Sequence, residues 1–302
     1  MPQDEKIPQC LANKRIGHYN TGCIRRWQKQ ECPQTMAEEG QDSQERNGDG
    51  MLKILVTNDD GIDAPGIAKL AACAAKLGTV TVVAPKSQCS GMSHHITLNR
   101  PMELKERLDF PVKGVKAYSL DGTPADCVRS VVHGMLDPDA GRKGAGTEAY
   151  FKQNPHFPDI VFSGINAGAN AGYDIVYSGT VGAAMEAVLY GIPAVCFSQE
   201  QAGCDEAADR YLDQIAGELI HRRLPAGQIW NVNFPRVGLK ALKGILYDRV
   251  PDHWCMYHDY YIEHNGYVTV TDEKRTTGDI RTDIGAILAG YISVGVVSNP
   301  VV

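Results

Sequence analysis

Short apolar runs alternate with helical patterns along most of this chain, and that alternation restricts the fold more than any other feature of the sequence. The first run, LKILVT, ends at Thr57 and is followed by IAKLAACAAKLG, which has helical spacing. Runs this apolar are typical of strands buried on both faces. Further strands are predicted at Val80–Ala84, Lys116–Leu120, Asp159–Ser163, Ala194–Ser198 and Ile229–Phe234. Strands alternating with helices predict an α/β fold with a doubly wound, largely parallel sheet of the Rossmann-like kind.

Helices are predicted between these strands. Asp63 is expected to cap the first, with Pro65 in its first turn and Gly78 at its end. Later helices are expected to open at Thr123-Pro124, to contain GAAMEAVLYG and to span Asp205–Arg223. The segment GINAGAN after Ser163 is expected to be a loop, and the Gly-rich residues 137–158 a surface insertion.

The pattern changes beyond about residue 244, where strand-like runs occur without helices. Asn265-Gly266, within Tyr257–Thr271, is a strong signal for a β-hairpin. We therefore predict an α/β domain from about residue 51 to 240, continued to residue 302 by a C-terminal β-hairpin projection. An isolated hairpin is marginally stable, so packing on a second copy is expected, as a homodimer or homotetramer.

Residues 1–50 differ in composition from the rest of the chain. They are polar, carry charges of both signs and show neither helical nor strand periodicity, which predicts a disordered extension before a domain at 51–302. Met51 stands directly before the first strand. Two interpretations remain open: a real flexible extension, or a start site assigned upstream of the true one.

Charge and cysteine content exclude several classes of protein. The net charge of −6 argues against a nucleic-acid polymer or an anionic membrane as partner. No apolar run approaches the roughly 18 residues of a membrane span, and the N-terminus lacks the apolar region of a signal peptide. Nine cysteines without a CxxC pair indicate reduced thiols in a cytoplasmic protein.

Four polar segments lie where ligands bind in such sheets, at the carboxyl ends of strands. They are NDDG, APKSQCSGMSHHIT, SGINAGAN and YSGTVGAA. Their candidate ligand atoms are oxygens, from Asp59, Asp60, Ser90 and Asn166. Hard oxygen ligands favour Mg²⁺, Mn²⁺ or Ca²⁺ over zinc, and a cation removes the repulsion between adjacent aspartates. An exposed turn is the alternative explanation for the aspartate pair.

Two further features have competing interpretations. Gly179 and Thr180 precede a helix, where free N–H groups favour a phosphate, although Ser178-Gly179-Thr180 could equally be a simple cap. His94-His95 could bind zinc, but adjacent histidines usually diverge and no further Cys or His spacing supports that interpretation.

Five stretches, taken together, resemble the survival protein E (SurE) family of metal-dependent nucleotidases, which dephosphorylate nucleoside monophosphates. In order they are ILVTNDDGIDAPGI, VVAPKSQCSGMSHHIT, LDGTPADCV, DIVFSGINAGAN and YSGTVGAAMEA. The later TDIGAILAGYISV resembles the family's closing strand. The N-terminal extension, the insertion at 137–158 and the short end after GYISV depart from the family pattern, and the last puts the usual assembly in question.

The resemblance implies a role for each matched position. Asp59, Asp60, Ser90 and Asn166 match the family's ligands for one divalent metal ion, Mg²⁺ or Mn²⁺. Its phosphate-contacting positions correspond to Asn170, Ser178, Gly179 and Thr180, and His94 matches a histidine in its substrate loop. Asp59 and Asp60 are the candidate catalytic residues. We expect Asp59 to orient or deprotonate the attacking water and Asp60 to act as a ligand, although the sequence leaves this order open.

Three rival functions were weighed. A receiver domain needs a phosphoacceptor Asp after a later strand, where Ser163 and Gly164 stand instead. A haloacid-dehalogenase-type phosphatase needs Asp-x-Asp, which NDDG lacks. A nucleotide-binding module without catalysis has no need for metal-ligating acids. That third function stays open as the alternative, and the family resemblance implies hydrolysis of nucleoside 5′- or 3′-monophosphates as the expected function.

Overall fold

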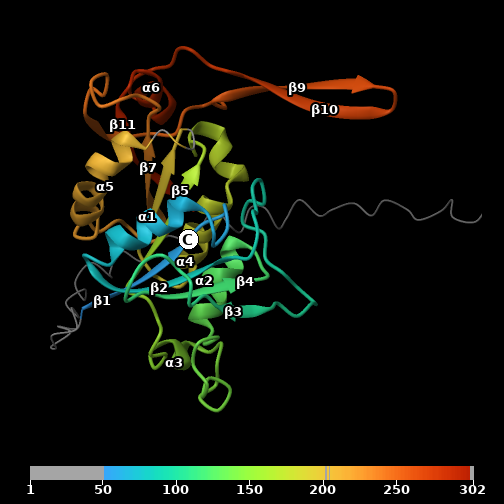
Figure 1. Ribbon diagram of the computed structural model, residues 1–302, viewed down its shortest axis with the longest axis vertical. Helices are drawn as coiled ribbons and strands as arrows, with labels where there is room; N and C mark the ends of the chain where they lie inside the picture. Colours follow the sequence, from blue (N-terminus) through green and yellow to red (C-terminus); the bar gives the residue numbers. More distant parts are fainter. Residues whose placement is uncertain (1–50, 201–202, 204, 300–302) are drawn as a thin grey trace, which may run out of the picture. The chain divides into compact units, whose positions relative to one another are not determined.

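Nine strands of the described residues form one sheet, with the order β3-β4-β2-β1-β5-β6-β7-β11-β8 (Figure 1). This computed structural model describes residues 51–200, 203 and 205–299, so the predictions for residues 1–50 concern residues outside it. The described residues belong to one compact unit, Gly50–Val302. The strands are β1 Leu52–Thr57, β2 Gly78–Pro85, β3 Leu104–Glu106, β4 Lys116–Leu120, β5 Ile160–Ala167, β6 Ala194–Gln199, β7 Gln228–Phe234, β8 Ile245–Arg249 and β11 Ile292–Ser298.

The sheet is largely parallel, as predicted. From β1 the chain adds β2 and β4 on one side and, after returning to the centre, β5, β6 and β7 on the other, all in parallel pairs. Only β3 with β4 and β11 with β7 are antiparallel pairs of this sheet. The strand order therefore reverses between β1 and β5, and ligands bind at such switch points, at the carboxyl ends of the strands.

Helices cover both faces of the sheet, because alternate residues of each strand point to opposite sides. Ile54 and Val56 of β1 pack in one cluster with helices α1 (Pro65–Ala74) and α5 (Glu206–Leu219). Leu55 packs on the other face, in a cluster with helices α2 (Pro124–Val132) and α4 (Gly179–Leu189). A strand apolar on both sides is thereby buried on both sides.

The predicted ends of the first helix were wrong. Ala64, and not Asp63, occupies the N-cap position, and it provides no side-chain cap. Asp63 instead accepts a hydrogen bond from Arg107 at 2.6 Å. The helix ends at Ala74, and Gly78 begins β2 because its Cβ-free backbone packs against Leu52 of β1. Pro65 in the first turn is confirmed.

The segment predicted as a loop after Ser163 and the predicted surface insertion both contain regular structure. Strand β5 continues beyond Ser163 to Ala167, so Asn166 lies in the strand, paired with Ser198 of β6. The insertion 137–158 contains a short helix, α3 (Glu148–Phe151), whose Tyr150 is fully buried and donates a hydrogen bond to Asp137. One buried tyrosine in a Gly-rich segment is too weak a pattern to predict this packing.

The predicted boundary near residue 240 was also wrong. Strands β8 and β11 rejoin the main sheet, and a helix, α6 (Asp283–Leu288), precedes β11. Helix α6 has a regular start, since the hydroxyl of Thr282 accepts from the N–H of Gly285. The prediction of no helix beyond residue 244 failed because six residues are too few to show helical periodicity.

The predicted hairpin is confirmed as β9 (Tyr257–His264) and β10 (Tyr267–Lys274). At its tip Asn265 has φ of 52° and Gly266 has φ of 80°, the left-handed backbone that a two-residue hairpin turn requires. The strands extend from the main sheet (Figure 1), and every residue of β10 is exposed.

The root of this hairpin is bonded to the 3₁₀ turn η2 (Gly172–Tyr177). The N–H of Tyr173 donates to the carbonyl of Trp254 at 3.0 Å. In return Asp174 accepts from the N–H of Met256 at 2.8 Å, and Asp283 accepts from the N–H of Gly172 at 2.9 Å. Turn η2 therefore has its conformation set by the segments on either side of the hairpin.

Candidate active site

The end of β1 and the end of β5 meet at the switch point of the sheet. Asp59 and Asp60 directly follow β1, and Asn166 lies near the end of β5. Asp60 joins the two strand ends, because its Oδ2 accepts from the N–H of Ala167 at 2.9 Å. Burial raises the pKa of Asp60, and the bond from Ala167 opposes that rise. The fold thus brings three of the four predicted metal ligands to one place.

Asp59 is buried, with 3% of its surface exposed. Its Oδ1 accepts from the hydroxyl of Thr180 at 2.5 Å. Burial raises the pKa of Asp59 to about 6, and the charge of Asp60 adds to that effect, whereas the hydroxyl and N–H of Thr180 oppose it. Burial disfavours the charged form of this carboxylate, and a bound cation would stabilise that charged form.

The start of α4 lies directly against Asp59. A Cβ added to Gly179 would lie 2.9 Å from Cβ of Asp59 and 3.2 Å from its Oδ2, closer than side chains normally pack. Glycine at this position therefore lets the first turn of α4 pack closely against the carboxylate. Ser178 caps the same helix, and its Oγ accepts from the N–H of Val181 at 3.1 Å.

The loop after β2 carries Ser90 to the same region. The N–H of Cys89 donates to the carbonyl of Asp59 at 2.7 Å, which fixes the neighbour of Ser90 at the end of β1. Ser90 is exposed, and its Oγ accepts from Gln88 at 3.0 Å. Further along, Ser93 donates through its N–H to Tyr177 at 2.9 Å. The loop is therefore held against both β1 and η2.

The donor atoms suit a hard divalent cation. The Nδ2 of Asn166 donates to the carbonyl of Gly168 at 2.8 Å, so Oδ1 is the end of this amide with capacity to act as a ligand. Within residues 51–200, 203 and 205–299, no group of three or more His, Cys, Asp or Glu side chains could hold a metal. Two aspartates with a serine hydroxyl and an asparagine carbonyl supply oxygen alone, the ligand atom that hard divalent cations prefer.

The four predicted phosphate-binding residues have different surroundings. Ser178, Gly179 and Thr180 lie together at the start of α4, although the buried hydroxyl of Thr180 is directed to Asp59. Asn170 is buried elsewhere in a polar network: its Nδ2 donates to Ser198 of β6 at 2.8 Å, and its N–H donates to Asn233 of β7. A phosphate contact for each of the four remains a prediction.

His94 contacts a residue that was not predicted from the sequence. Its Nε2 lies 2.7 Å from Oε2 of Glu186, a buried residue of α4. Arg129 of α2 donates to the other oxygen of Glu186 at 3.0 Å. Burial, the largest influence, favours the neutral acid, but the bonds from His94 and Arg129 bring the pKa of Glu186 below its ordinary value. The sequence signal that could have identified Glu186 is a single glutamate within the otherwise apolar helical pattern GAAMEAVLYG.

Comparison with known proteins assigns the family. Residues 54–254 match the family model described as survival protein SurE. The chain belongs to the SurE family. The matched segment contains all the candidate site residues, from Asp59 to Thr180.

Similar SurE proteins match well beyond the candidate site. The chain is 35% identical over 248 residues to the 5′-nucleotidase SurE of Thermoanaerobacter sp. (strain X514), covering 80% of this chain and 90% of that protein. It is 38% identical over 256 residues to 5′-nucleotidase SurE 1 of Thermus thermophilus, covering 82% and 92%. A crystal structure of the SurE protein from Aquifex aeolicus superposes with a TM-score of 0.64 and 31% identity, covering 82% of this chain and 93% of that one.

Proposed function

We propose that this chain is a divalent-metal-dependent nucleotidase that hydrolyses nucleoside 5′-monophosphates to nucleoside and inorganic phosphate. The observation that carries the proposal is the placement of adjacent Asp59 and Asp60 at the switch point, where Asp60 is bonded to the end of β5 and Asp59 to the first turn of α4. The relatives named 5′-nucleotidase SurE support the same reaction. Residues 51–302 form the proposed nucleotidase domain.

We assign one Mg²⁺ or Mn²⁺ to Asp59, Asp60, Ser90 and Asn166. When bound, such an ion polarises the phosphoryl group and offsets its negative charge. Lys86 is the one lysine or arginine in the four polar segments, and it donates to Glu103, so protein cations contribute little of this charge.

The chain's own residues bind the phosphate and manage the proton. Ser178 accepts from Val181, which leaves its hydroxyl hydrogen available for a phosphoryl oxygen. Gly179 is the first residue of an 11-residue helix. Its free backbone N–H and the positive end of the helix dipole favour a bound phosphate. We assign Asn170 and Thr180 to supporting positions around this phosphate.

Asp59 orients the attacking water and accepts its proton. Burial raises the pKa of Asp59, which favours proton uptake by its carboxylate, whereas a bound cation would favour its charged form. The water oxygen forms a bond to phosphorus, the ester P–O bond breaks, and the nucleoside leaves as an alcohol by taking up the proton that Asp59 accepted from the water. Asp60 acts as a ligand, positioned by its bond from Ala167.

Assembly and location complete the proposal. The exposed apolar side chains of β9 and β10, which include Tyr261 and Val270, are assigned to contacts between copies in a homodimer or homotetramer. No described helix is long and apolar enough to cross a membrane. Cys73, Cys89, Cys127, Cys196 and Cys255 are free thiols, which supports the cytoplasm as the location.

A panel of 5′- and 3′-nucleoside monophosphates and simple phosphate esters, assayed with Mg²⁺, Mn²⁺ or EDTA, tests the proposal. We expect phosphate release from 5′-monophosphates that EDTA abolishes. Release that is insensitive to EDTA would contradict the metal assignment. Nucleotide binding without any turnover would instead identify a noncatalytic binding module.

A further inference from the structure

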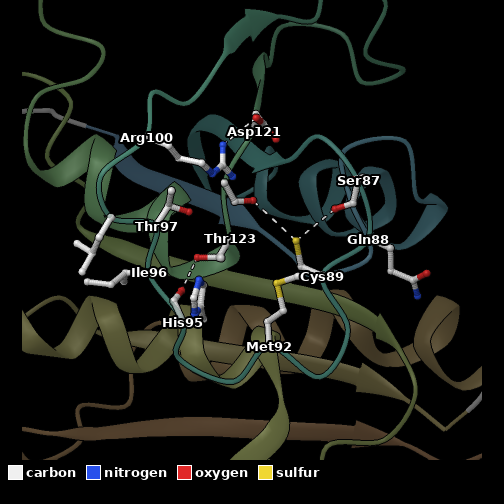
Figure 2. A pocket seen from close by; sticks show the side chains of 12 residues that line it. Ser87, Gln88, Cys89, Met92, His95, Ile96, Thr97, Arg100, Asp121 and Thr123 are labelled. Carbon is white, nitrogen blue, oxygen red and sulfur yellow. Dashed lines mark hydrogen bonds and ion pairs between the residues drawn. The ribbon is translucent and has the colours of Figure 1, made fainter. Parts of the chain in front are cut away.

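A cavity of about 430 Å³ lies beside the candidate active site, at the carboxyl ends of β2 and β4. One wall is the loop that follows β2, from Ser87 to Arg100, and the other is the turn from Asp121 to Thr123 that follows β4 (Figure 2). Its volume is in the range of pockets that take small organic ligands. None of the site residues assigned above lines it.

Cys89 joins the cavity to the candidate active site. Its N–H donates to the carbonyl of Asp59, and its Sγ lies 3.4 Å from the carbonyl of Ser87 and 3.8 Å from that of Gly122. Figure 2 shows this thiol between the two walls. Burial and nearby carboxylates raise the pKa of Cys89, so the thiol stays neutral at neutral pH and acts as a structural link.

The opposite wall also leads to the phosphate end of the site. Thr123 caps helix α2 and donates to the carbonyl of His95 at 2.5 Å, which ties the two walls together. The next residue, Pro124, has its Cγ within 3.2 Å of the position that a Cβ on Gly179 would take. A ligand with its phosphate beside Gly179 therefore has this cavity as a neighbouring space.

The lining suits an uncharged group. Arg100 and Asp121 form an ion pair with each other at 2.9 Å, so the cavity presents no unpaired cation for a phosphate. Met92 and Leu98 line it although their side chains are 42% and 69% exposed. Apolar surface beside paired hydrogen-bonding groups is typical of a site for a flat heterocycle with polar edges.

We propose that this cavity receives the nucleoside moiety of the substrate. Met92 and Leu98 contact the faces of the base or sugar, and Arg100 and Asp121 offer a donor and an acceptor to their edges. The inference rests on the proposed nucleotidase function and adds a substrate-selecting site to it.

The test compares Leu98→Asp with a matched control, Leu108→Asp, which changes a 90% exposed leucine that does not line the cavity. For each protein, kcat/KM is measured for adenosine 5′-monophosphate and for p-nitrophenyl phosphate. The ratio of the two values is expected to fall about tenfold in Leu98→Asp and to keep its wild-type value in Leu108→Asp. Melting temperatures verify that both variants are folded.

Calorimetric titration with adenosine separates this inference from the proposed function. We expect adenosine to bind the wild type and Leu108→Asp, and its affinity for Leu98→Asp to fall about tenfold. Equal adenosine affinity in all three proteins, or no binding to the wild type, would overturn the cavity assignment even if nucleotides are hydrolysed. If no nucleotide is hydrolysed, the proposed function fails, and the adenosine titration still decides the cavity.

Discussion

The hydroxyl of Thr180 lies 2.5 Å from Oδ1 of Asp59, so the first turn of α4 and the end of β1 are joined by one buried hydrogen bond. The two residues are 121 positions apart in the chain. Their contact determines both the orientation of the carboxylate and the distance of the helix start from it.

Thr180→Val removes this bond while keeping the shape of the side chain. We expect kcat/KM for the nucleotide to fall by roughly tenfold to a hundredfold, because a buried carboxylate loses a donor that holds its charged form. Thr180→Ser retains the hydroxyl and is expected to recover most of the activity. Equal losses in the two variants would show that the methyl group matters as much as the bond and would contradict this prediction.

Asp59→Asn and Asp60→Asn test the metal assignment directly. Each is expected to weaken Mn²⁺ binding in a calorimetric titration and to lower activity by about a hundredfold or more. The melting temperature of metal-free Asp59→Asn is expected to match or exceed that of the wild type, because a buried charge is removed. A fully active Asp59→Asn protein would refute the assignment.

Glu186→Ala leaves His94 and Arg129 without their shared carboxylate. We expect the free energy of unfolding to fall by about 3 kcal/mol, as for other broken buried ion pairs. KM is expected to rise because the loop that carries Ser90 loses its tie to α4. The control is Glu148→Ala, whose exposed pair with Lys152 is worth under about 0.5 kcal/mol. Similar unfolding curves for the two variants would contradict this account.

The buried carboxyl of Asp283 is expected to make the stability of the folded chain depend on pH. Burial raises its pKa from 3.8 to about 6 in the folded chain, so the folded state binds the proton more tightly than the unfolded state. Its contribution to stability is therefore complete below about pH 4 and is lost as the pH rises through 6, by about 3 kcal/mol in all.

Asp283→Asn, which does not titrate, isolates this effect. Urea unfolding at several pH values is expected to show that the stability of the wild type, relative to the variant, declines between pH 4 and pH 7. The other carboxylates are common to both proteins and cancel in the difference. A difference that is constant over this range would refute the prediction.

Tyr261→Asp tests the proposed assembly surface. Tyr261 is 70% exposed and pairs across the hairpin with exposed Val270, so a charge there is expected to separate the copies. Light scattering at micromolar concentration should give a dimer or tetramer for the wild type and a smaller species for the variant. Leu189→Asp, at the exposed end of α4, is the control. A monomeric wild type would exclude this mode of assembly.

The strands and the hairpin turn were the predictable part of this molecule. β1, β4 and the turn at Asn265-Gly266 were predicted correctly because each has a strong local pattern. The position of Asp60 beside the end of β5 also follows from sequence, since a reversal of strand order brings two strand ends together. The family resemblance then assigned chemistry to those positions.

Local sequence patterns could not predict the contacts between distant segments. Aspartate is a common helix-capping residue, yet the side chain of Asp63 bonds to Arg107, more than forty positions away. The bond of Thr180 to Asp59 and that of Glu186 to His94 depend on how α4 packs against the sheet. Tyr150 is buried because the insertion packs back on α2. The residues of the insertion show no periodic pattern from which this packing could be predicted.

The turn η2 has a consequence for how such chains change over evolution. Its first residues are bonded to the hairpin root through Trp254 and Met256, and its last residue leads directly to Ser178. A substitution that shifts the hairpin root therefore also displaces the residue that begins α4. The proposed assembly surface and the proposed phosphate site are thereby linked through the six residues of η2, so a change in one is expected to affect the other as such chains diverge.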